Sequence, residues 1–78
     1  MKSYKVLYYE LRFIDDSNED KKIILKDRGS VVNLAPKISR IFNECYVFRY
    51  IESDSKKQLD RDFLEYYDNT GYGVKLRF

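Results

Sequence analysis

The sequence predicts a small two-layer α+β domain in which a mainly antiparallel four-stranded sheet carries helices on one face. Three observations lead to this fold class. The chain has 78 residues, enough for one hydrophobic core and a single domain, residues 1–78. Residues 4–14 alternate between apolar and polar side chains, as a half-buried strand does. Two later segments place apolar residues at helical spacing, so the expected element order is β-β-α-β-α-β.

The first half of the chain is expected to form a hairpin followed by a helix. Residues 4–14 place four apolar side chains on one face of a strand: Leu7, Tyr9, Leu11 and Phe13. Residues 15–20 form a polar turn, and residues 21–26 form a second strand that pairs with the first. Gly29 and Ser30 interrupt the pattern. Asn33 then suits the N-cap of a helix over residues 34–44, whose first turn tolerates Pro36.

The second half is expected to continue with a strand, a helix and a strand. Residues 45–51 are aromatic and β-branched, which predicts the third strand. A second helix over residues 55–68 would carry one apolar stripe: Leu59, Phe63, Leu64 and Tyr67. Residues 69–71 would end this helix, and residues 72–78 would form the last strand. An alternative replaces the second helix with a hairpin over residues 59–78 that turns at residues 69–71.

Composition excludes several classes of function. Histidine is absent, which disfavours Ser-His and Cys-His hydrolases, zinc fingers and His-ligated metal enzymes. Cys45 is the single cysteine, so a disulfide within one chain is excluded and a reducing compartment is favoured. No apolar run approaches the roughly 20 residues that span a bilayer, and no secretory signal is visible. We therefore expect a non-catalytic, cytoplasmic protein with no cofactor, no metal ion and no membrane association.

Charge is segregated along the chain although the net charge is only +2. Residues 15–20 and 52–68 are acidic, whereas the predicted strands are basic. Carboxylates beside tyrosines on the second helix would suit a basic groove of another protein, because opposite charges steer encounter and tyrosine supplies anchor area. The expected partner-binding residues are Asp60, Asp62, Glu65, Tyr66 and Tyr67. The leading hypothesis is a small phage- or mobile-element-type inhibitor, of the anti-CRISPR or anti-restriction kind, that binds a host nucleic-acid-processing protein.

A second hypothesis uses the sheet face that the helices leave open. A face that mixes cations and aromatic rings can bind single-stranded nucleic acid, because bases stack on rings and phosphates pair with cations. The expected residues are Tyr8, Arg12, Lys22, Lys26, Lys75 and Arg77. Tyr46, Phe48 and Tyr50 would extend this face, or they would form the core and leave Arg49 outside. A second copy of the chain covering the same face would instead make it a homodimer interface.

Two other patterns in the sequence are incomplete. The D-x-N-x-D spacing of residues 16–20 resembles the start of a calcium loop, but Lys21 stands where that loop needs a glycine. Glu10, Arg12, Arg49 and Tyr50 contain the groups that a histidine-free ribonuclease would use. Their spacing does not select that chemistry, and both patterns are weaker than the two binding hypotheses.

Overall fold

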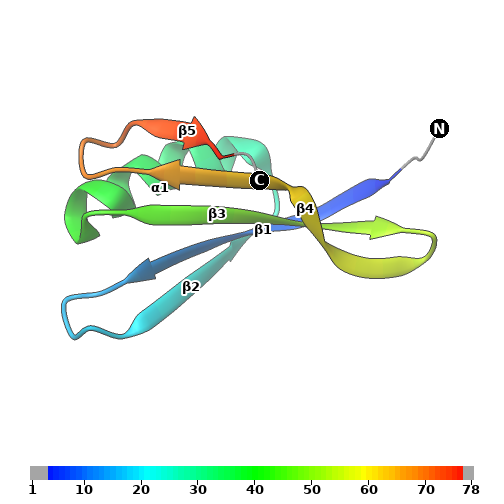
Figure 1. Cartoon of the computed structure of the whole chain (residues 1–78), viewed down its shortest axis with the longest axis horizontal. Coiled ribbons are helices and arrows are strands. Elements are labelled where there is room, and N and C mark those ends of the chain that lie inside the picture. Colours follow the sequence, from blue (N-terminus) through cyan, green and yellow to red (C-terminus); the bar gives the residue numbers. More distant parts are fainter. Residues whose placement is uncertain (1–3, 77–78) are drawn as a thin grey trace.

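The computed structural model describes residues 4–76 and contains one α-helix packed on a five-stranded antiparallel sheet (Figure 1). The elements are β1 (Lys5–Ile14), β2 (Asp20–Leu25), α1 (Arg28–Phe42), β3 (Cys45–Ser53), β4 (Lys56–Tyr67) and β5 (Gly73–Lys75). The strand order in the sheet is β2-β1-β3-β4-β5. The α+β class is confirmed, whereas the prediction of four strands and a second helix is wrong.

β1 lies inside the sheet, between β2 and β3, although it comes first in the chain. It pairs antiparallel with both β2 and β3, so β2 and β3 are parallel to each other and α1 must cross back over the sheet to join them. Leu11 lies opposite Ile23 on one side and Val47 on the other, which places the three side chains in one row. Together with buried residues of α1 this row forms the core: Tyr9, Leu11, Val31, Ala35, Ile38, Cys45, Val47, Phe63 and Tyr67.

α1 begins six residues before the predicted start. Asp27, not Asn33, is the N-cap, and its side chain accepts a hydrogen bond of 2.7 Å from the Ser30 amide. This cap gives a backbone amide of the first turn a hydrogen-bond partner, and the helix can begin at Arg28. Gly29 and Ser30 therefore lie inside the helix instead of interrupting it. Pro36 consequently lies in the middle of α1, and the Ser39 hydroxyl donates to the Pro36 carbonyl at 2.9 Å.

The segment predicted as a second helix is the longest strand, β4. Asp54 and Ser55 both have positive φ angles, 53° and 63°, as the tight turn of a two-residue hairpin requires. The chain therefore reverses at these residues and pairs back along β3, from Ser53 opposite Lys56 to Cys45 opposite Tyr67. A hairpin turn therefore lies where the second helix was expected to begin.

The alternative prediction of a hairpin after residue 59 is confirmed. β5 pairs antiparallel with the end of β4, and Gly71, with a φ of 85°, donates its amide to the Asp68 carbonyl in the connecting turn. β5 covers only Glu65 to Tyr67, so in residues 4–76 the outer side of β4 has no paired strand from Lys56 to Asp62. In this same part of the chain, α1 is too short and too polar to cross a membrane.

Candidate binding surface

The sheet has one face covered by α1 and one that we call the open face. Side chains alternate between the two faces along each strand. Because Tyr9, Leu11, Cys45 and Val47 lie in the core with α1, their neighbours along the strands point the other way. The ladders then show that the open face includes these side chains: Tyr8, Glu10, Arg12, Lys22, Ile24, Tyr46, Phe48, Tyr50, Leu59, Leu64 and Tyr66.

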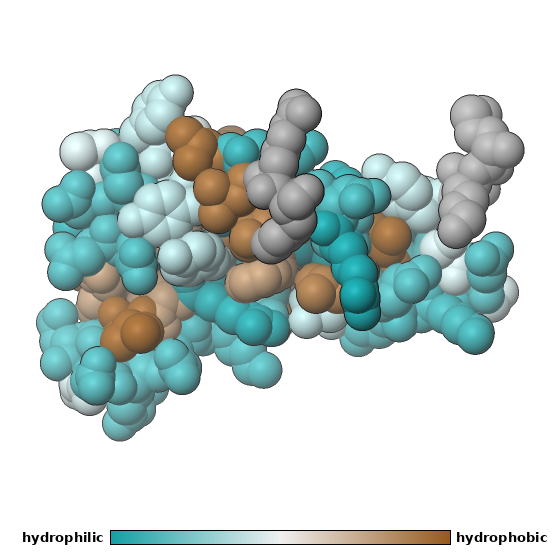
Figure 2. Space-filling model, viewed as in Figure 1, coloured by the Kyte–Doolittle hydropathy of each residue, from teal (hydrophilic) through white to brown (hydrophobic). Residues whose placement is uncertain are grey.

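Five aromatic rings lie on the open face across β1, β3 and β4. Tyr8 and Tyr50 are stacked with ring centroids 4.9 Å apart, and Tyr46 and Tyr66 lie 5.1 Å apart in a tilted arrangement. Phe48 lies between these two pairs along β3. All five side chains are half-buried, so part of each ring reaches solvent. In Figure 2, hydrophobic side chains gather over β4 and β5 and again at the β1–β2 end, with polar side chains around them.

A buried carboxylate fixes the central arginine of this face. Glu10 is 5% exposed and accepts hydrogen bonds from Arg12 Nε at 2.7 Å and Arg12 Nη2 at 2.6 Å. The guanidinium carbon of Arg12 lies 4.5 Å from the Phe48 ring centroid. The hydrogen bond with Glu10 raises the pKa of Arg12. Glu10 therefore holds the Arg12 guanidinium over an aromatic ring, with about half of the Arg12 side chain still exposed.

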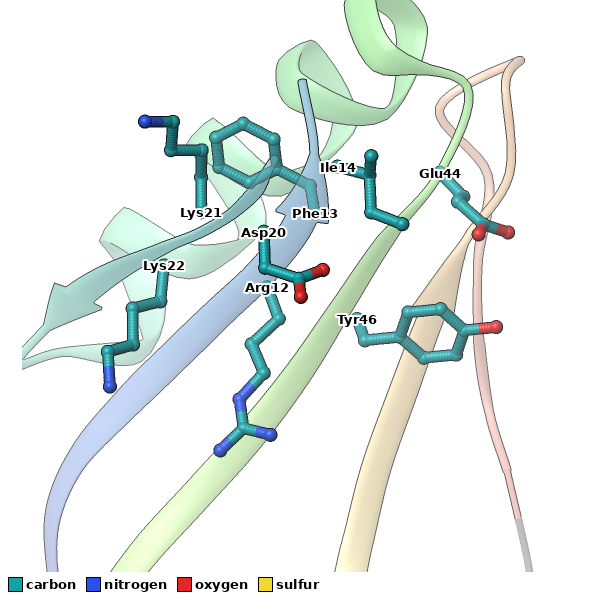
Figure 3. A pocket seen from close by; sticks show the side chains of 8 residues that line it. All are labelled: Arg12, Phe13, Ile14, Asp20, Lys21, Lys22, Glu44 and Tyr46. Carbon is teal, nitrogen blue, oxygen red and sulfur yellow. The ribbon is translucent and has the colours of Figure 1, made fainter. Parts of the chain in front are cut away.

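Lys22 lies beside this pair and borders a hollow at the β1–β2 end of the sheet. Its Nζ is 4.0 Å from Glu10, and its side chain is largely exposed. Figure 3 shows Arg12 and Lys22 extending in the same direction, with Lys21 and Phe13 on the other side of the strands. The hollow, of about 560 Å³, also has Asp20 and Glu44 in its wall, so its charges are mixed.

The residues expected to bind nucleic acid are only partly brought together. Tyr8, Arg12 and Lys22 share the open face, and Lys26 follows β2 in the connection to α1. Lys75 lies opposite Glu65 on the other face, with its Nζ 5.9 Å from the Phe63 ring centroid. Arg77 lies outside the described residues. The predicted open-face position is thus correct for the residues of β1 and β2. It is wrong for Lys75, because the register of β5 places this side chain on the face covered by α1.

The residues expected to bind a protein partner do not form one surface. Asp60 is buried against Arg49, whose Nη2 lies 2.6 Å from its carboxylate, and Tyr67 is in the core. Glu65 accepts two hydrogen bonds from Arg28 at the start of α1. Asp62 is exposed, and Tyr66 lies on the open face. Strand β4 distributes these side chains over both faces of the sheet.

Sequence reasoning missed Glu10 as the anchor of Arg12 and Lys57 as a neighbour of the aromatic rings. Lys57 Nζ lies 4.8 Å from the Tyr8 ring centroid, a contact that exists only because β4 pairs with β3. Of the possible ribonuclease residues, Glu10, Arg12 and Tyr50 share the open face, but Arg49 lies on the other. Recognising the Asp54-Ser55 turn would have revealed this arrangement.

Comparison with other proteins adds no identification. No protein-family model matches the chain, and neither curated proteins nor solved structures give a significant match. The geometry of the open face is therefore the basis for the function proposed below.

Proposed function

We propose that this protein is a non-catalytic binding protein whose open face binds single-stranded nucleic acid. The observation that carries the proposal is the set of five half-exposed rings on three adjacent strands, with Arg12, Lys22 and Lys57 beside them. Unpaired bases offer flat surfaces that stack on such rings, whereas the bases of a duplex are already stacked and out of reach.

The positions of the cations fit a strand that runs across the face. Lys57 lies beside the Tyr8–Tyr50 pair, while Arg12 and Lys22 lie on the β1 and β2 side of the Tyr46–Tyr66 pair. Phosphates can therefore reach a cation on either side of Phe48. Because few of these cations lack a nearby carboxylate and the net charge is only +2, we expect moderate affinity that falls steeply with salt.

The test is fluorescence anisotropy of labelled single-stranded oligonucleotides at low salt. Tyr46→Ala and Tyr8→Ala should each weaken binding by about 1–3 kcal/mol, the range for loss of one stacked base. Tyr72→Ala, at an exposed ring in the β4–β5 turn, is the matched control and should bind as the wild type does. Lys22→Ala should make oligonucleotide affinity less dependent on salt. Lys37→Ala, on the exposed side of α1, is the control and should leave this dependence unchanged. Absence of binding by the wild type at low salt would overturn the proposal.

A second candidate is an inhibitor that occupies the nucleic-acid groove of a processing enzyme. Tyr66 favours it, because this ring lies on the open face near the Glu44 carboxylate, and partial desolvation together with that carboxylate raises the Tyr66 pKa. Such pairs suit a basic protein groove. A pull-down from host lysate after nuclease treatment should then retain a defined enzyme, and the Glu44→Ala/Tyr66→Ala double variant should release it. Loss of capture on nuclease treatment would contradict this candidate.

A further inference from the structure

The two sides of the sheet differ in how regular their outer strands are. β2 pairs with β1 residue by residue, from Leu25 to Asp20, without a register shift. On the other side, β5 covers only the end of β4, and β4 bulges where residues 60–63 lie opposite Arg49 alone. A bulge hinders an outer strand from pairing with another chain, whereas a regular edge presents a row of unpaired amide and carbonyl groups. β2 is therefore the edge that can accept a further strand.

The outer side of β2 is accessible in the part of the chain that the structure describes. Figure 1 shows β2 along the lower edge of the sheet, with no other element beyond it. Ile24 is 50% exposed on the open face. Ile23 packs against the core from the opposite face and is itself only partly buried. An added strand would bury apolar surface on both faces of β2.

Lysines commonly prevent edge strands from associating, because their charges repel an incoming strand. The two lysines of β2 are compensated within the chain. Lys21 Nζ lies 3.1 Å from Glu19 and 3.8 Å from Asp15, and Lys22 Nζ lies 4.0 Å from Glu10. These lysines therefore oppose a further strand less than unpaired lysines would.

Charge selects one register for the pairing of β2 with β2 of a second copy. A two-fold axis normal to the sheet makes the strands antiparallel and keeps each side chain on its own face, so the axis must pass through a residue. With the axis at Ile23, Asp20 lies opposite Lys26 of the second copy at both ends, and Lys22 lies opposite Ile24. Moving the axis by one residue places Lys22 opposite Lys22 or opposite Lys26 of the second copy, and like charges directly opposite are destabilising. Larger shifts pair fewer residues of β2.

We propose that β2 is a self-association edge, through which two copies of this chain join antiparallel into one continuous sheet. The aliphatic part of Lys22 would cover Ile24 of the second copy, and ion pairs between Asp20 and Lys26 would close both ends. The pairing would end there, because Asp27 caps α1 and the chain leaves the sheet. Both open faces would lie on the same side of the joined sheet. This inference does not depend on whether the open face binds nucleic acid.

Sedimentation equilibrium of charge variants tests the proposed pairing. Asp20→Lys places like charges opposite each other at both ends and should weaken the dimer at least about tenfold. The double variant Asp20→Lys/Lys26→Asp exchanges the two charges and should restore wild-type association. Asp62→Lys is the matched control, because it makes the same charge change at an exposed residue of β4, and it should associate as the wild type does.

A cysteine crosslink tests the register itself. Ile23→Cys places a thiol opposite its own copy across the axis, where paired Cα atoms lie about 4.5–5.5 Å apart, within reach of a disulfide. Oxidation with copper–phenanthroline should therefore give a covalent dimer. Asp20→Cys is the control and should not crosslink, because its two copies lie about 20 Å apart in this register. The native Cys45 is buried and should not react.

Two results would contradict self-association through β2. The first is a wild-type protein that remains monomeric at millimolar concentration. The second is a dimer that Asp20→Lys leaves intact and that Ile23→Cys does not crosslink, because association would then use another surface.

Discussion

The two faces of β3 differ in the size of their side chains more than in their polarity. Cys45 and Val47, on the covered face, are small and fully buried against Ala35 of α1. Tyr46, Phe48 and Tyr50, on the open face, are large and half-exposed. A helix needs small residues to approach a sheet closely, whereas large rings can shield a bare face by packing against one another. An aromatic strand therefore does not by itself identify the core.

The largest difference between the faces should appear in stability. Leu11→Ala removes a fully buried side chain from beneath α1 and should cost about 2–5 kcal/mol, because it leaves a cavity in the core. Ile24→Ala, at a half-exposed position on the open face, should cost less than about 1 kcal/mol. Urea unfolding of both variants provides the comparison, and equal losses would show that the open face is packed as tightly as the covered one.

A smaller effect is expected at the buried carboxylate of the open face. Glu10→Ala leaves the Arg12 guanidinium without its fixed partner and should cost about 1–3 kcal/mol. The same variant should weaken oligonucleotide binding, because Arg12 is then free to leave Phe48. A double-mutant cycle with Arg12→Ala measures the coupling, and additive losses would mean that the pair is not coupled.

The covered face can also be tested through its thiol. Burial raises the pKa of Cys45 to about 12, so the native thiol should resist Ellman's reagent at pH 8 and react only on unfolding. The unfolded thiol ionises near its ordinary value of 9.0, so the native state should lose stability as the pH rises above that value. Cys45→Ala should show a shallower decline, since the raised pKa of buried Tyr67 still contributes. Rapid labelling under native conditions would show that α1 opens readily.

The smallest effect is expected in the β4–β5 turn. Hydrogen bonds from the Thr70 side chain and backbone lower the pKa of Asp68, helped by the Tyr72 amide. This stabilisation is present above the ordinary value of 3.8 and is lost as the pH falls through the lower native pKa. Asp68→Asn should therefore have a flatter acid-unfolding curve than the wild type. Parallel curves would show that the turn contributes nothing measurable.

Local patterns in the sequence predict the first half of the fold better than the second. The alternation of β1 is strong, and its hairpin with β2 follows from it. The apolar residues of 55–68 fit the spacing of a helix as well as that of a strand. What makes this segment a strand is the hairpin turn before it, where Asp54 and Ser55 adopt positive φ angles. Polar residues reach positive φ less readily than glycine does, so this turn is hard to recognise.

The candidate site could be predicted only where it depends on alternation within one strand. Tyr8 and Arg12 were placed correctly because both belong to β1. The Glu10–Arg12 pair also lies within β1, whereas the Lys57–Tyr8 contact depends on the register of β4 against β3, which has no local signature. Lys75 was misplaced for the same reason, because one residue of register exchanges the two faces.

The pairing of β1 with both β2 and β3 has a consequence for the order of folding. The β1–β2 and β3–β4 hairpins join residues close in the chain and can form independently, but Leu11 meets Val47 only after the intervening helix has closed the chain. Closing that segment costs conformational entropy before any β1–β3 pairing compensates it, and such non-local pairing slows folding. Docking of the two hairpins should therefore limit the folding rate, and α1 should become stable together with the core.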